Sequence, residues 1–372
     1  MSTDSQTVIL AAGPLQVRGT SSYTLLLAER LPEYGYSPVI VSPDLASLPE
    51  EARPKCPTYE HLLLSSSLFR PLINGLVAKD AATHKPSLVH IQSRHALAFG
   101  FALAKRLDLP CLVTIHDHDK TLARTMSAGQ ARLQRIIAVS SSVKESLVSE
   151  HSLNEDMITV IHSGVAVPDL VDNSEVLGGR RIPVVGTAGR LEESKGIPYF
   201  IKAARQVLDA GKDVEFLIAG SGPEERQLRA LARQLNLTKH LTFITNLPDF
   251  RSAIHAMDIF CLPSLMQGLG TVMLEAMSLG RPVIATGVGG ITSIVRDDGT
   301  GLVIPAADSD ALAERIIELL DDPIRARAIG SAARQQVIES FDASQMVELT
   351  ANEYRSAISC SADTTAATTT GS

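Results

Sequence analysis

The feature that most constrains the fold is the repeated alternation of short apolar runs, rich in β-branched residues, with longer amphipathic stretches. In the first half, amphipathic stretches at 21–33, 61–78, 96–107 and 142–150 separate runs at 7–11, 38–41, 88–91, 111–115, 135–139 and 158–161. Strand, helix and strand in repetition are typical of a parallel sheet covered by helices on both faces. The first half is therefore predicted to be a doubly wound α/β domain.

This alternation breaks once and then restarts. Residues 162–181 are rich in Gly, Pro, Asp and Asn and show no period, which is typical of a linker. Six further strands are predicted at 184–188, 214–219, 241–244, 259–262, 282–285 and 302–304. The chain has 372 residues, which is long for one core. The fold class is thus α/β, with two tandem Rossmann-like domains.

The predicted boundaries follow from this pattern. They are an N-terminal domain over 1–165, a linker over 166–182, a second domain over 183–341, a helix over 342–359 that packs back on the first domain, and a disordered tail over 360–372. The tail is predicted from its polar, low-complexity composition. Ligands of open parallel sheets bind at the carboxyl ends of the strands, so a cleft between two facing sheets is the expected ligand site.

Composition excludes several classes of function. The chain has no Trp, only 4% aromatic residues and a net charge of −7, which argues against nucleic acid as a partner. All seven negative charges fall after residue 165, since residues 1–165 carry 15 basic and 15 acidic residues. No apolar stretch reaches the ~18 residues of a membrane span and the N-terminus does not resemble a signal peptide. A cytoplasmic protein is expected.

One loop carries two cations beside two glycines. The stretch GTAGRLEESKG, residues 186–196, follows a predicted strand and leads into a helix, with Arg190 and Lys195 beside Gly189 and Gly196. Small residues allow backbone amides to approach an anion, and a helix N-terminus favours negative charge. The loop suits a diphosphate, although two ordinary surface charges on a solvated loop would give the same pattern. A second glycine turn, AGSGPEERQLR, has acidic residues directly behind it and is interpreted as structural.

A further loop leads to an isolated carboxylate. The stretch PSLMQGLGTVMLEAMSLGRPVIA places Gly268 and Gly270 ahead of a helix that begins near Thr271, and Glu275 lies about one turn into that helix among apolar residues. A carboxylate there can accept hydrogen bonds from the two hydroxyls of a ribose. The alternative is an ordinary Glu on an exposed helix surface.

Taken in order, these segments resemble the retaining GT-B glycosyltransferases, the glycosyltransferases group 1 with family-4-like relatives. The resemblance rests on Gly-Arg-Leu, Lys-Gly, Pro-Ser, Gly-x-Gly, Glu-Ala-Met, Gly-x-Pro-Val-Ile-Ala and Gly-Gly, which cover nearly the whole second half. The first half is similar more loosely, through RGTSSYTLLLAERLPEYGYSPVIV, VTIHD and IAVSSSV. The family implies two facing Rossmann-like domains, a nucleotide diphosphate sugar as donor substrate (UDP- or GDP-sugar), and neither a cofactor nor a metal.

The resemblance also implies roles for individual residues. Arg190 and Lys195 would neutralise the donor diphosphate and Glu275 would bind the ribose hydroxyls. His116 would lie near the donor sugar and phosphate. Backbone groups of the glycine loops, and of the start of the helix near Thr271, would also contact the donor. These residues are Gly19, Gly189, Gly268, Leu269, Gly270 and Thr271.

The sequence departs from the family at several positions. The family typically has a Glu, then seven intervening residues, then a second Glu. Here the second is Glu275, but the first position is occupied by Gln267. Gln keeps the hydrogen bonds and loses the charge, so a changed sugar preference or a slower transfer is expected. Arg18 precedes Gly19 where the family usually has two glycines. His116 is followed by Asp117, His118 and Asp119, but adjacent residues cannot all face one ion, and no metal site is predicted.

Several alternatives stay open at this point. The acceptor is expected to be a glycan or a lipid-linked glycan. The expected biosynthetic setting is the assembly of lipid-linked glycans or of cell-surface polysaccharide. The helix predicted within 61–79 could contact the inner face of a membrane, although a core-facing amphipathic helix is favoured. Two rival functions remain. One is a nucleotide-sugar epimerase of the same fold. The other is a donor-binding protein that has lost transfer activity, which Gln267 supports.

Overall fold

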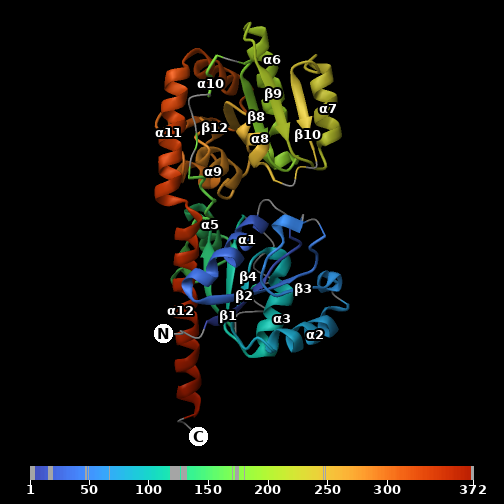
Figure 1. Cartoon of the computed structure of the whole chain (residues 1–372), viewed down its shortest axis with the longest axis vertical. Helices are drawn as coiled ribbons and strands as arrows, with labels where there is room; N and C mark the ends of the chain where they lie inside the picture. The colour runs from blue at the N-terminus through green and yellow to red at the C-terminus, as the bar shows by residue number, and fades with distance from the viewer. Residues whose placement is uncertain are drawn as a thin grey trace. The chain divides into compact units, whose positions relative to one another are not determined.

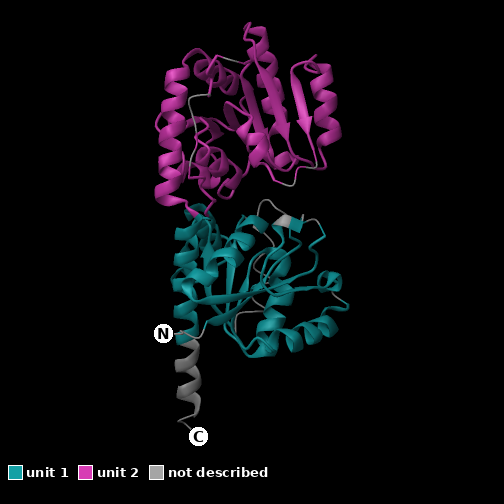
Figure 2. Ribbon diagram, in the orientation of Figure 1, with its two compact units in different colours: residues 1–163, 343–372 teal, residues 164–342 magenta. Residues whose placement is uncertain are grey.

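The computed structural model describes residues 5–15, 20–46, 48, 50–66, 68–117, 126, 132–169, 171, 176–179, 181–245, 247 and 249–369. It divides into two compact units. Unit 1 comprises residues 1–163 and 343–372, and unit 2 comprises residues 164–342 (Figure 2). Each unit is a parallel sheet with helices packed against it (Figure 1), as the alternation of runs predicts.

Unit 1 contains a seven-stranded parallel sheet in the order β3-β2-β1-β4-β5-β6-β7. Its strands are β1 (Gln6–Ala11), β2 (Tyr36–Ser42), β3 (Thr58–Glu60), β4 (Pro86–Ile91), β5 (Cys111–Ile115), β6 (Leu133–Ala138) and β7 (Ile158–Val160). Its described helices are α1 (Thr20–Arg30), α2 (Arg70–Ala82), α3 (Leu97–Leu107), α5 (Ser141–Ser149) and α12 (Ala343–Thr369).

Unit 2 contains a six-stranded parallel sheet in the order β10-β9-β8-β11-β12-β13. Its strands are β8 (Val184–Ala188), β9 (Glu215–Ala219), β10 (Leu241–Ile244), β11 (Ile259–Leu262), β12 (Val283–Thr286) and β13 (Leu302–Ile304). Its helices are α6 (Ile197–Asp209), α7 (Glu225–Gln234), α8 (Arg251–His255), α9 (Thr271–Ser278), α10 (Ser309–Asp321) and α11 (Pro323–Ser340). Between β12 and β13 the chain forms the 3-10 helix Gly289–Ser293.

The C-terminal helix α12 belongs to the core of unit 1. Tyr354, one of its residues, is fully buried, and its hydroxyl lies 2.6 Å from Nδ1 of His90 on β4. The other ring nitrogen of His90 lies 2.7 Å from the Thr114 hydroxyl on β5. Burial lowers the pKa of His90 to about 3, with a smaller contribution from His116 in the same direction, so the imidazole is neutral at neutral pH. This network joins α12 to two central strands.

The structure differs from the sequence-based prediction in two segments, the C-terminal end and the predicted linker. Helix α12 continues to Thr369, past residue 359 where the predicted helix ends, so the predicted disordered tail is wrong for its described backbone. The physical reason is that no Gly or Pro interrupts the chain between Ala343 and Thr369. The predicted linker, 166–182, lies within unit 2, where Val176 and Leu177 are part of the hydrophobic core.

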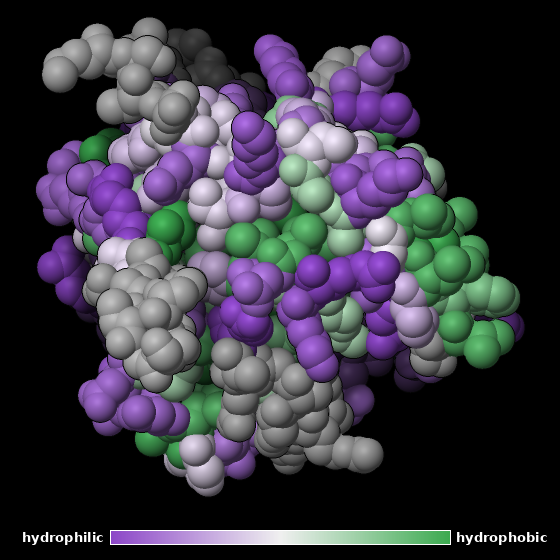
Figure 3. All heavy atoms as spheres, turned by 90° about the horizontal axis from the view of Figure 1, so that it is seen from below, coloured by the Kyte–Doolittle hydropathy of each residue, from purple (hydrophilic) through white to green (hydrophobic). Residues whose placement is uncertain are grey.

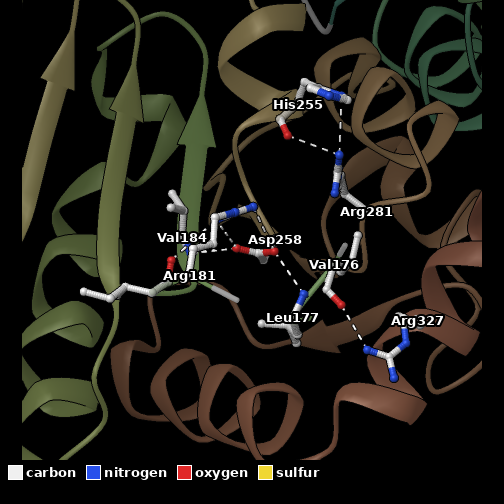
Figure 4. A network of polar contacts seen from close by, with 9 residues as sticks. Val176, Leu177, Arg181, Val184, His255, Asp258, Arg281 and Arg327 are labelled. Atoms are coloured by element: carbon white, nitrogen blue, oxygen red, sulfur yellow. Dashed lines mark hydrogen bonds and ion pairs between the residues drawn. The ribbon is translucent and has the colours of Figure 1, made fainter. Parts of the chain in front are cut away.

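A buried carboxylate holds this linker segment in place (Figure 4). The Asp258 side chain is 2% exposed and accepts hydrogen bonds from the backbone N–H groups of Leu177 and Val184, at 3.0 and 2.8 Å. The Arg181 guanidinium donates to both carboxylate oxygens, at 2.8 and 3.1 Å. These four bonds satisfy the carboxylate, which would otherwise be costly to bury.

The amphipathic stretch 61–78 is broken into two helices. A 3-10 helix (Leu62–Ser65) precedes α2, which begins only at Arg70, with Pro71 in its first turn where proline is favoured. Helix α2 buries Ile73, Val77 and Ala78, as a core-facing helix would. It also exposes a second apolar stripe, which the core-facing interpretation does not anticipate. The exposed apolar residues are Leu62, Leu63, Leu68, Phe69, Leu72 and Leu76, called the α2 apolar surface below.

Candidate functional site

The candidate residues of unit 2 lie at the point where its strand order reverses. Strand β8 is the first strand of the unit, and β9 and β11 pair with it on opposite sides. Ligands of open α/β sheets bind outside the carboxyl ends of the strands at such a switch point. The loop after β8 carries Arg190 and Lys195, and the loop after β11 carries Gln267 and Gly268, so the topology brings both loops to this edge.

The two loops are joined by direct contacts. The Lys195 ammonium donates to Oε1 of Gln267 at 2.9 Å, and the Ser264 hydroxyl donates to the same oxygen at 3.3 Å. The backbone N–H of Leu265 donates to the Ser194 carbonyl at 2.8 Å. Lys195 and Gln267, 72 positions apart in the sequence, therefore share one site.

Glycine allows this close approach at two positions. Gly196 has a φ of +61°, and a Cβ atom there would lie 2.0 Å from the Pro263 carbonyl oxygen. Gly289 has a φ of +55°, and a Cβ atom there would lie 1.8 Å from the Gln267 carbonyl oxygen. Only glycine fits where backbone meets backbone in a left-handed conformation. The loop carrying Gln267 is thus held between the loop after β8 and the loop after β12.

Arg190 lies in the same turn as Lys195 with its guanidinium at the surface. Its side chain is 68% exposed, and Nε lies 3.0 Å from a carboxylate oxygen of Glu192. An exposed ion pair of this kind contributes little to stability, so Arg190 can exchange its partner for a ligand at small cost. The preceding Gly189 has a φ of +155°, and its carbonyl oxygen would lie 1.9 Å from a Cβ on Gly220. That contact supports the structural interpretation of the second glycine turn.

The start of helix α9 presents backbone donors to the site. Gly270 precedes the helix with a φ of +89°, and Thr271 is its first residue. Among the described residues, the N–H groups of Leu269, Gly270 and Thr271 have no hydrogen-bond acceptor. The free N–H groups at a helix start carry partial positive charge. They can therefore donate to an anionic ligand.

Glu275 lies on α9, one turn after Thr271, and is partly buried. Burial raises the pKa of its carboxyl group to about 7, while Arg251 lowers it and Asp249 raises it. In the described part of the chain no side chain or N–H group donates to this carboxylate. Glu275 is therefore not the solvated surface carboxylate of the alternative interpretation, and it is free to accept hydrogen bonds from a ligand.

His116 belongs to unit 1 and follows β5. Its Nε2 donates to the Gln92 carbonyl at 3.1 Å, and its ring lies edge-on to that of Tyr23, with centroids 5.0 Å apart. Burial lowers the pKa of His116 to about 4, against the opposing effects of Asp117 and of the bond to Gln92. A carbonyl only accepts, so Nε2 carries the proton and the neutral ring presents Nδ1 as an acceptor.

The remaining candidates of unit 1 fall outside the described residues. These are Gly19 and its neighbour Arg18, and also His118 and Asp119 of the cluster after His116. In the part of the chain that the structure describes, no three His, Cys, Asp or Glu side chains are grouped as for a metal ion.

Sequence reasoning missed three polar groups near these sites. Ser264 donates to Gln267, and Gln92 and Ser93, at the carboxyl end of β4, have buried polar atoms, Nε2 and Oγ, without a partner in the described structure. The Pro-Ser pair after β11 is the signal that could have indicated Ser264. No local pattern marks Gln92 or Ser93, because their burial depends on contacts between distant segments.

Comparison with known proteins agrees with this geometry. The family model for glycosyl transferases group 1 matches residues 180–336, and the model for glycosyltransferase family 4 matches residues 17–167. A GDP-mannose-dependent monoacylated alpha-(1-6)-phosphatidylinositol monomannoside mannosyltransferase of Corynebacterium glutamicum is 42% identical over 164 residues, which are 42% of this chain and 42% of that protein. The match thus spans less than half the length of this relative.

Two further similarities cover more of the chain. A phosphatidyl-myo-inositol mannosyltransferase of Mycobacterium leprae is 28% identical over 87% of this chain and 89% of its own length. The crystal structure of HepE from Anabaena, in complex with UDP and glucose, superposes with a TM-score of 0.80 at 20% identity, over 94% of this chain and 100% of that one. The structural match establishes the fold alone.

The two family models cover most of both units in the expected order, and the fold matches that of solved structures over nearly the whole chain. This chain, with its two Rossmann-like domains, belongs to the group 1 glycosyltransferases of GT-B fold.

Proposed function

We propose that the protein transfers a hexose-type sugar from a nucleotide diphosphate sugar, with UDP or GDP as the nucleotide, to an acceptor hydroxyl with retention of the anomeric configuration. The observation that carries the proposal is the junction of two loops at the switch point of unit 2, where Lys195 contacts Gln267. The family membership supports the reaction class, and the loop junction is where we propose that the donor binds.

The charges at this junction suit a departing diphosphate. Arg190 and Lys195 supply two cations, and the N–H groups of Leu269, Gly270 and Thr271 supply donors without partners in the described structure. Preorganised donors and cations aimed at a developing anion are often the largest contribution to catalysis. We propose that they stabilise the leaving group without a divalent metal or a cofactor.

Glu275 is proposed to bind the ribose of the donor. Its carboxylate has no donor among the described residues, and it lies one turn from the amides that would contact the phosphates. Two ribose hydroxyls would donate to the carboxylate and would favour its ionised form. In unit 1, Nδ1 of neutral His116 is proposed to accept a hydrogen bond from a hydroxyl of the donor sugar.

The proposed transfer needs no protein nucleophile, because the acceptor and the departing diphosphate account for every bond and proton. The acceptor oxygen forms a bond to the anomeric carbon on the face from which the diphosphate departs, and the bond between that carbon and the phosphate oxygen breaks. The proton of the acceptor hydroxyl passes to the departing phosphate. Arg190 and Lys195 would stabilise the negative charge on the diphosphate while this proton moves.

A thermal-shift series tests donor binding. Both UDP and GDP, and their sugars, should be screened, because a ligand stabilises the folded state in proportion to its binding. Replacement of Arg190 or Lys195 by Ala should remove the shift, whereas replacement of the exposed Lys239 by Ala should preserve it. An unchanged shift in the first two variants would contradict the diphosphate assignment. Added chelator should leave binding and transfer intact if no metal takes part.

A lipid-linked acceptor at the cytoplasmic face of a membrane is proposed from the α2 apolar surface. Leu72 and Leu76 follow one another at helical spacing on α2, and Leu68, just before the helix, is 77% exposed. Apolar side chains gather on the side of unit 1 where α2 lies (Figures 1 and 3). The relatives from Corynebacterium glutamicum and Mycobacterium leprae are named for transfer to phosphatidylinositol lipids. In the described structure no helix is long and apolar enough to cross a bilayer.

Charge favours an anionic bilayer as the occupant of this surface. The sequence has no acidic residue between Glu60 and Asp80, whereas Arg70 and Lys79 lie in that interval. The Arg106 guanidinium also lies beside α2, 3.2 Å from the position of a Cβ on Gly75. Basic residues around an exposed apolar helix face are typical of interfacial binding to anionic lipid.

Vesicle flotation tests this contact. The protein should float with vesicles that contain phosphatidylglycerol and much less with phosphatidylcholine alone. A double variant, Leu72→Gln with Leu76→Gln, should stay unbound, whereas Ile324→Gln, at a 76% exposed residue of unit 2, should float normally. Binding that persists in the double variant would overturn the assignment. So would self-association that the double variant abolishes, because the surface would then be a protein interface.

A further inference from the structure

Gln267 is the residue of the site that departs from the family pattern, and its contacts fix how its amide is oriented. The Lys195 ammonium has three donors and no acceptor, so the side-chain atom 2.9 Å from it must be the oxygen. The Ser264 hydroxyl lies 3.3 Å from the same oxygen. The assignment of oxygen and nitrogen, which is often ambiguous for Gln, is thus settled by chemistry.

The amide nitrogen of Gln267 consequently lies on the side away from Lys195 with both of its hydrogens available. The side chain is partly exposed, and among the described residues nothing accepts a hydrogen bond from Nε2. The backbone is fixed, because the Gly268 carbonyl accepts from the Gly290 N–H at 2.8 Å. The backbone is fixed and the side-chain oxygen accepts two hydrogen bonds, so the NH₂ group is held in one direction.

The neutral side chain also leaves the charge of Lys195 uncompensated. A carboxylate at this position would form an ion pair with the ammonium, whereas an amide oxygen leaves the full positive charge for a ligand. Two acidic residues lie in the turn. Glu192 is bound to Arg190 at 3.0 Å and to the Ser194 hydroxyl at 2.9 Å, and among the described residues Glu193 forms no ion pair with Lys195. The site therefore presents a cation and a double donor where the family pattern would present a cation and an anion.

We propose that Gln267 determines sugar specificity, and that the site takes a donor whose sugar carries a carboxylate, a nucleotide-linked uronic acid. The inference rests on the proposed function, because it assumes that a nucleotide sugar binds beside Lys195. A sugar carboxylate would accept the two N–H bonds of Gln267 while the Lys195 ammonium faces the diphosphate of the same donor. A Glu at this position would repel the same carboxylate, because like charges in contact cost several kcal/mol.

The test compares two nucleotide sugars that differ only at this group. The dissociation constants of UDP-glucose and UDP-glucuronic acid, or of GDP-mannose and GDP-mannuronic acid if guanine is the base, are measured by calorimetry for the wild type and Gln267→Glu. The wild type should bind the acidic sugar at least as tightly as the neutral one. The Gln267→Glu variant should shift the ratio at least about tenfold toward the neutral sugar, a change of about 1.4 kcal/mol.

Two further variants separate specificity from general damage. Gln234→Glu adds the same charge at an exposed position of α7 and should leave the ratio unchanged. Gln267→Leu removes the donors without adding charge and should weaken the acidic sugar more than UDP or GDP alone. Nucleotide binding with an unchanged ratio in Gln267→Glu would overturn this inference and leave the proposed function standing. Failure of the wild type to bind any nucleotide would overturn the proposed function itself.

Discussion

Replacement of Glu275 by Gln should stabilise the free protein above neutral pH while it weakens the binding of nucleotide. The side chain is partly buried on α9, and burial raises the pKa of its carboxyl group from 4.5 to about 7. The folded state therefore binds the proton more tightly than the unfolded state, and stability falls as the pH rises between these two values. Gln has a similar shape and does not ionise.

The size of the effect follows from the shift. A difference of about 2.5 pKa units, at about 1.4 kcal/mol each, gives an upper limit of about 3.5 kcal/mol. Because the side chain is partly exposed, solvent screening reduces this value, and we expect about 1–2 kcal/mol at pH 8. The stability difference between variant and wild type should grow from about pH 4.5 to about pH 7 and then level off.

Urea unfolding followed by far-ultraviolet circular dichroism measures this difference, since the chain has no Trp for fluorescence. The matched control is Glu314→Gln, at an exposed position of α10 in the same unit, which should show no such dependence. A stability difference for Glu275→Gln that is flat across this pH range would refute the reasoning. Unchanged affinity for UDP and GDP would refute the proposed contact with the ribose.

Three further predictions concern groups that support the site. Asp258→Asn should destabilise unit 2 by about 2–4 kcal/mol in urea unfolding, because an NH₂ group would replace a carboxylate oxygen and would face the N–H donors that this oxygen now accepts from. The control, Asp321→Asn, removes a surface ion pair with Lys212 and should cost under about 1 kcal/mol. Unit 1 should lose stability as the pH falls from about 6.5 toward 4, because burial lowers the pKa of His90 and the unfolded state is therefore protonated first. His90→Gln should reduce this dependence of stability on pH in acid titrations followed by circular dichroism. Gly196→Ala should lower both the melting temperature and nucleotide affinity, whereas Gly211→Ala, also at positive φ but in open space, should lower the melting temperature only slightly.

Much of the fold could be predicted because most of the strands are short apolar runs that are visible in the local sequence. Strand β11 was predicted at the bounds it has in the structure, Ile259–Leu262, and so was β8. The edge strand β3 was missed because its three residues, Thr58–Glu60, carry no apolar run and pair only with β2. The break before α2 was missed because apolar residues continue across it, and only the serines and Pro71 mark it.

The candidate site was predictable to the level of loops and not to the level of contacts. Glycines and cations that follow strands indicate where an anion can bind and point to Lys195, whereas Gln267 is a candidate only through the family resemblance. Their hydrogen bond joins positions 72 residues apart, and no local pattern encodes it. The raised pKa of Glu275 likewise depends on the packing around α9 and on Arg251 and Asp249, which precede it by more than 20 residues.

The placement of α12 has a consequence for biosynthesis. Unit 1 is made of the first 163 residues and the last 30, and the fully buried Tyr354 comes from the last segment. On the ribosome, unit 2 is complete before the N-terminal sheet can receive its final helix. The N-terminal portion must therefore keep an apolar face open until α12 has been synthesised, and a chaperone would be needed during this interval.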